Sequence, residues 1–170
     1  MAKGSFIHKL FAAGPIALLY YLSISDVDTN LEKIFEIFSF NLQIIIIYFW
    51  IIKRPNLMGT GHIFLAGLIN DVIMGFPLGI SSLSYLVVCF VGNYVRNKSV
   101  NTTIASDWFT FFIALLLSNL LFFSLINNFT ELAFSYTKIG YNTFFTLFLF
   151  PIFWLLFNLY QFSFIGNQDA

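Results

Sequence analysis

Asp71 is the residue of this sequence whose chemistry most needs an explanation, because it lies within a run of apolar residues. Gly67, Asp71 and Gly75 follow one another at intervals of four, which places them on one face of a helix. An ionised carboxylate at the centre of a bilayer costs about 3 kcal/mol on insertion scales. We therefore expect Asp71 to face a bundle interior, a water cavity or a partner. The flanking glycines would let another backbone approach this face closely.

Three roles for Asp71 remain open from the sequence. The carboxylate could pair internally with Ser, Asn or Tyr groups of the next helix, or it could order the bundle for a partner protein, and these two roles are compatible. The third role is a proton or ion relay, which usually needs a second titratable group within reach. Glu36 and His62 are the other candidates, but they fall near opposite ends of the expected helices, so a relay is the least favoured role.

The segment after Asp71 predicts a tight turn between two helices. Gly75 and Gly79 permit a positive φ, and Pro77 between them fixes φ near −65°. The expected hairpin therefore has a stiff tip on the extracytoplasmic side. The tip is either a purely structural turn or a contact for an extracytoplasmic partner, and Tyr85 follows it in the next helix.

Basic residues mark two further helix ends. Pro55 biases Arg54 away from helical angles, so Lys53-Arg54-Pro55 is expected to stop a helix on the cytoplasmic side, as are Arg96 and Lys98. Such residues are sufficiently explained as orientation anchors. Contact with a lipid headgroup or with a cytoplasmic partner is the alternative.

The elements that carry these residues are expected to be membrane helices. Of 170 residues, 59% are hydrophobic and 9% are charged, whereas soluble domains carry roughly 25% charged residues. Eight basic residues balance eight acidic ones, so no net charge points to nucleic acid. The single cysteine, Cys89, allows no disulfide within the chain.

The expected fold class is all-α: one polytopic transmembrane helical bundle of about six spans, occupying residues 1–170 as a single domain. Apolar segments without strand-like alternation favour helices, and the first is interpreted as a retained helix rather than a signal peptide. Lysines and arginines fall mostly on one side when the N-terminus is cytoplasmic, which predicts that both termini are cytoplasmic. The expected spans are residues 10–25, 35–52, 62–74, 79–95, 108–126 and 139–160.

Motifs of common enzymes are missing from the sequence. It contains no phosphate-binding Walker loop, no zinc-type histidine pair and no Gly-x-Ser-x-Gly elbow. We therefore expect a protein that is not an enzyme and that needs no cofactor or metal.

The ordered combination of these residues resembles the MreD family of bacterial rod-shape-determining membrane proteins. The residues that carry the resemblance cover about 40 positions: Trp50, Arg54 and Pro55; Gly67, Leu68, Asp71, Gly75, Pro77, Leu78 and Gly79; and Tyr85. The remainder of the chain agrees only in length, number of spans and orientation.

The resemblance implies a non-enzymatic component of the bacterial inner membrane that regulates cell shape and lateral peptidoglycan synthesis. Its expected partners are membrane lipid and MreC, and through MreC the actin-like MreB, RodA and a class-B penicillin-binding transpeptidase. The resemblance also implies a fold like that of the substrate-binding subunits of energy-coupling-factor transporters. The alternative function is therefore a vitamin-binding importer subunit, for which Asp26, Asp28 and Asn128 are the only polar candidates.

Overall fold

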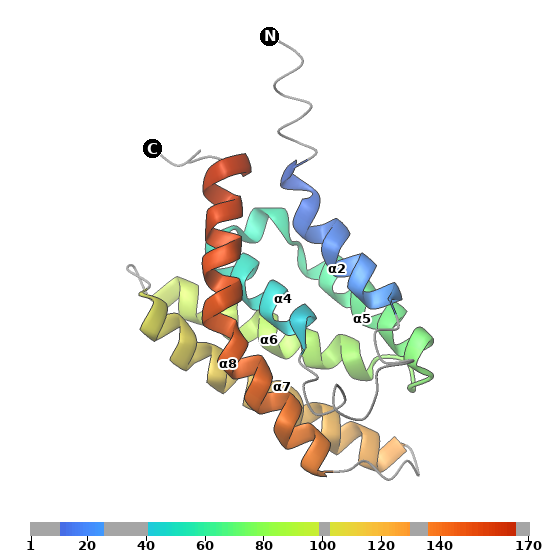
Figure 1. The fold of residues 1–170 in the computed structure, drawn as a ribbon. Coiled ribbons are helices and arrows are strands. Elements are labelled where there is room, and N and C mark those ends of the chain that lie inside the picture. The colour runs from blue at the N-terminus through green and yellow to red at the C-terminus, as the bar shows by residue number, and fades with distance from the viewer. Residues whose placement is uncertain (1–10, 26–40, 99–102, 130–135, 166–170) are drawn as a thin grey trace.

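Helices account for all regular secondary structure in the part of the chain that the structure describes. The computed structural model describes residues 11–25, 41–98, 103–129 and 136–165 (Figure 1). These residues form six α-helices and no strand, so the expected all-α class is confirmed. The α-helices are α2 (Gly14–Ile24), α4 (Leu42–Lys53), α5 (Thr60–Met74), α6 (Ile80–Lys98), α7 (Ile104–Phe129) and α8 (Tyr136–Tyr160), with a short 3-10 helix η1 (Pro55–Leu57) and a π-helical end η2 (Gln161–Ile165).

The helices coincide with the expected apolar segments, with shifts at their ends. Residue 10 of the first expected span and residues 35–40 of the second lie outside the described residues. The largest extension is at α7, which begins at Ile104 instead of residue 108 and continues to Phe129 instead of residue 126. The Thr103 hydroxyl accepts a hydrogen bond from the Ser106 N–H at 3.3 Å, which is the contact of a helix N-cap. Asp107 thus becomes part of a helix.

Helix α4 is the centre of the bundle. Every residue from Ile44 to Ile52 is buried, and a helix that is apolar on all sides is stable only when it is surrounded. Figure 1 shows α4 with α2 and α5 on one side and α8 on the other, and it also contacts α6. The helix starts where the Asn41 side chain accepts the Ile44 N–H at 3.1 Å, and it ends before Pro55.

Helices α7 and α8 form an outer wall with little burial. The segments Ile104–Phe129 and Ile139–Ser163 are long and apolar enough to cross a membrane, yet only 28% and 17% of their most apolar stretches are buried. A long apolar helix at the core of a soluble protein would instead be mostly covered.

The start of α2 and the end of α8 lie at the same end of the bundle. The Tyr160 hydroxyl donates a hydrogen bond to the Phe11 carbonyl at 2.8 Å, and the Trp50 ring, near the end of α4, lies 6.3 Å from the Tyr160 ring. The C-terminal end of α4, with Lys53, therefore belongs to this same end.

Candidate functional site

Asp71 is fully buried and joins α5 to the beginning of α6. Its Oδ2 accepts the Gly79 N–H at 2.8 Å, and its Oδ1 accepts the Ser81 N–H at 2.9 Å. The first N–H groups of a helix have no partner within that helix, and the helix dipole favours a negative charge beside them. A carboxylate supplied by α5 therefore caps α6.

The tip between the two helices is built on two glycines in left-handed conformations. Gly75 ends α5 with φ +68°, and Gly79 precedes α6 with φ +104°. The Phe76 N–H donates back to the Asp71 carbonyl at 2.9 Å, in the manner of a left-handed helix end. Leu78 at the tip is 70% exposed.

The close approach between α5 and α6 occurs at Gly67. A Cβ on Gly67 would lie 2.4 Å from Ser82 Cα, and the Ser82 hydroxyl donates to the Phe64 carbonyl at 3.0 Å. The close approach expected at Gly75 is wrong, because a Cβ there would meet nothing within 4 Å. Gly75 shares the helix face by spacing, but the chain needs its left-handed φ to leave the helix.

Polar side chains from four helices surround this junction. Tyr85 donates to Gln43 Oε1, and Gln43 Nε2 donates to Asn70 Oδ1 at 3.3 Å and to Ser23 Oγ at 3.4 Å. Asn70 Nδ2 in turn donates to Ser81 Oγ at 3.1 Å. We call the set the hairpin network; it consists of Ser23, Gln43, Asn70, Asp71, Ser81 and Tyr85.

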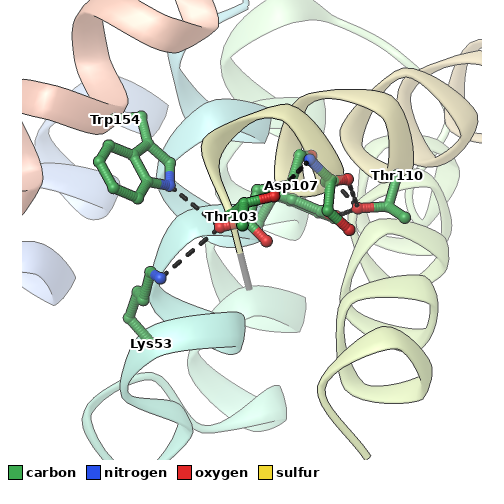
Figure 2. Close-up of polar contacts among 7 residues, drawn as sticks. Lys53, Thr103, Asp107, Thr110 and Trp154 are labelled. Atoms are coloured by element: carbon green, nitrogen blue, oxygen red, sulfur yellow. Dashed lines mark hydrogen bonds and ion pairs between the residues drawn. The ribbon is translucent and has the colours of Figure 1, made fainter. Parts of the chain in front are cut away.

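A second polar cluster lies at the opposite end of α4 and consists of Lys53, Asp107 and Trp154 (Figure 2). Asp107 Oδ2 accepts the Trp154 indole N–H at 3.1 Å and lies 3.6 Å from Lys53 Nζ. The same ammonium lies 5.1 Å from the centre of the Trp154 ring, within the range of a cation–π contact. We call this set the basic-end cluster; it ties α4, α7 and α8 together.

Asp107 is the buried acid that the sequence reasoning missed. It is 1% exposed, and its Oδ1 accepts no hydrogen bond from the described residues. Its position immediately before the expected span starting at residue 108 resembled a loop. A signal was present in Thr103 four residues earlier, since threonine before an apolar run is a common helix start. Nothing in the sequence indicated that Lys53 would be its partner.

The other predicted anchor residues lie at helix ends. Arg54 caps the end of α4, and Pro55 opens η1. Arg96 and Lys98 are exposed in the last turn of α6, where cations interact favourably with the helix dipole. Lys98 Nζ lies 4.8 Å from the centre of the Tyr94 ring.

The two clusters lie apart, and each joins neighbouring helices. Gln43 and Lys53 are ten residues apart on α4, or about 15 Å along the axis. Both Asp71 oxygens already accept backbone hydrogens, and the described residues contain no group of three or more potential metal ligands. Of the relay candidates, His62 Nδ1 lies 3.0 Å from Tyr20 Oη, while Glu36 is outside the described residues.

Of the three polar candidates for a vitamin site, only Asn128 belongs to the part of the chain that is described. Asp26 and Asp28 lie outside it. Asn128 is exposed at the end of α7, where its amide donates to the Ser124 carbonyl at 2.6 Å.

Comparison with known protein families, curated proteins and solved structures found no match to this chain.

Proposed function

We propose that this chain is a non-enzymatic inner-membrane scaffold of the bacterial cell-elongation machinery. It spans the membrane several times with both termini in the cytoplasm, and it binds an MreC-type partner that connects it to MreB, RodA and a class-B penicillin-binding transpeptidase. The observation that carries the proposal is the hydrogen bonding of Asp71 to Gly79 and Ser81. These residues belong to the segment that resembles the MreD family.

The hairpin has the properties that a scaffold needs. Gly67 allows α5 and α6 to touch, Asp71 caps α6, and Gly75 and Gly79 turn the chain. Each contact fixes the position of the tip relative to the bundle, and a rigid surface loses less conformational entropy when it binds. The hairpin network extends this support to α2 and α4.

Membrane insertion is supported by the outer surfaces of α7 and α8. Large apolar side chains remain exposed along both helices, and contiguous apolar surface of this kind normally contacts lipid or another protein. The orientation is supported by Phe11, Lys53 and Tyr160 lying at one end of the bundle, because basic residues mark the cytoplasmic side.

The tip offers the contact for the extracytoplasmic partner. Leu78 projects from a turn held by Pro77 and two positive-φ glycines, and it is 70% exposed. An exposed apolar side chain on a rigid support is a suitable anchor for a partner pocket.

Recovery of an MreC-type partner with the tagged chain tests this proposal. Leu78→Ser should lower the recovered partner about tenfold, equivalent to roughly 1.4 kcal/mol. Leu159→Ser on α8 is the matched control, because Leu159 is 64% exposed and lies next to Tyr160, at the end of the bundle opposite the tip. The control should recover the partner normally. Equal recovery with both variants would remove the tip from the proposal, and no recovery with the unchanged chain would contradict the scaffold itself.

A further inference from the structure

Helix α5 is short, and its length is fixed at both ends. It has 15 residues, Thr60–Met74, which corresponds to about 22 Å at 1.5 Å per residue. The preceding Gly59 is extended, with φ −65° and ψ 147°, and the following Gly75 has φ +68°. Because neither neighbour is helical, α5 does not continue in either direction. A typical hydrocarbon core is about 30 Å thick.

The apolar part of the exposed surface of α5 is shorter still. Its exposed large apolar side chains run from Phe64 to Ile73, which is about 14 Å along the helix axis. Thr60, Gly61 and His62 form an exposed polar first turn on one side of this stretch. On the other side the chain turns at the tip.

The exposed apolar surface of helix α8 is instead long. Exposed apolar side chains recur every three or four residues along α8 and form one stripe about 27 Å long. The stripe consists of Tyr141, Phe144, Phe148, Ile152, Leu155 and Leu159. In Figure 1, α8 and α5 lie on different sides of α4. The bundle therefore has a long exposed apolar surface on α8, which we call the tall wall, and a short one on α5, which we call the low wall.

Helix α5 cannot slide to match the tall wall. The Asp71 bonds to Gly79 and Ser81 and the contact of Gly67 with Ser82 fix its height against α6. Burying its polar first turn in hydrocarbon would require desolvation of backbone and side-chain groups, at several kcal/mol for each unsatisfied group. Deforming the lipid requires only a fraction of a kcal/mol for each ångström of mismatch.

We propose that the α5 face binds the acyl chains of a locally thinned bilayer, while the α8 face contacts bilayer of ordinary thickness. This inference rests on the membrane insertion in the proposed function. The occupant of the low wall is lipid because its exposed side chains are large and apolar, as on α8, and because the exposed polar turn of Thr60, Gly61 and His62 bounds it at one end. The bundle would thus bend the membrane surface on one side only.

Spin-label scanning of the full-length protein in liposomes tests the inference. The background variant is Cys89→Ser, and the vesicles contain dioleoyl phosphatidylcholine and phosphatidylglycerol. A nitroxide is placed on cysteine variants of α5 and its tip, at Gly61, Phe64, Val72 and Leu78, and of α8, at Tyr141, Phe148 and Leu159. Collision with oxygen reports the hydrocarbon, and collision with a water-soluble nickel complex reports the aqueous phase.

We expect all α8 labels, and the Phe64 and Val72 labels, to collide mainly with oxygen. Labels at Gly61 and Leu78 should collide at least fivefold more with nickel than those at Tyr141 and Leu159. Equal depths for these two pairs would overturn the thinning and leave the proposed function intact. Protection of Phe64 and Val72 from both reagents would show that a protein covers the low wall, again overturning the inference alone. Nickel access along all of α8 would overturn membrane insertion and this inference together.

Discussion

The Asp71 carboxylate and the Ser81 backbone N–H lie on successive helices and are joined by a hydrogen bond of 2.9 Å. With the Gly79 N–H on its other oxygen, the side chain of α5 performs the capping that helices usually obtain from a residue of their own. The hairpin is consequently closed at the tip by a buried carboxyl group rather than by apolar packing alone.

Removing this carboxylate should loosen the hairpin. Asp71→Ala leaves the buried Ser81 N–H and the half-buried Gly79 N–H without acceptors. We expect a loss of about 2–4 kcal/mol in unfolding free energy, since an unsatisfied buried donor costs about 1–3 kcal/mol. Asp71→Asn retains one acceptor oxygen and should lose less than half as much. Denaturation in mixed detergent micelles measures both values. Equal stability of all three proteins would mean that the cap contributes nothing.

A methyl group at Gly67 should push α5 away from α6. Gly67→Ala places a carbon 2.4 Å from the Ser82 backbone, and overpacking of this kind usually costs about 1–3 kcal/mol. Gly61→Ala is the control in the same helix, because a Cβ there meets nothing within 4 Å. The control should be neutral or stabilising through helix propensity. The same denaturation assay measures both variants. If Gly67→Ala left the unfolding free energy unchanged, α5 and α6 would not be in contact at that position.

Gly75 should resist substitution because of its backbone angle rather than its surroundings. At φ +68°, an L-residue loses roughly 1–2 kcal/mol, so Gly75→Ala should destabilise the protein by that amount. Gly75→Asn should be milder, since asparagine tolerates this conformation best among non-glycine residues. If alanine and asparagine gave the same stability as glycine, the left-handed helix end would be absent in solution.

Lys53 and Asp107 should show coupled effects in a double-mutant cycle. Lys53→Met leaves the Asp107 carboxylate, which is 1% exposed, without its cation, and loss of one partner of a buried pair typically costs about 3 kcal/mol. Adding Asp107→Leu should restore much of the loss, because the uncompensated charge is gone. Strict additivity of the two single effects would contradict the ion pair.

Apolar content and segment length sufficed to predict the helices. Both the apolar composition and the backbone hydrogen bonding of a helix are properties of a whole segment, so they can be recognised without knowing the tertiary contacts. The special position of Asp71 could also be expected, since a lone acid between two glycines is unusual in an apolar helix. Of the two reasons predicted for Gly75, the positive φ of the turn is confirmed and the close approach is wrong, because spacing alone does not distinguish a close approach from a helix end. Asp107 was missed because its partners Lys53 and Trp154 are 54 and 47 residues away, and such pairing depends on tertiary packing.

Cell outline after depletion of this protein in its native host tests the central claim most directly. We expect rods to round into spheres and to be restored by the unchanged chain, but not by Asp71→Ala expressed to the same level in the membrane. Gly61→Ala, expressed equally, should restore rods and serves as the control. Rods that keep their shape throughout depletion would contradict a role in cell elongation.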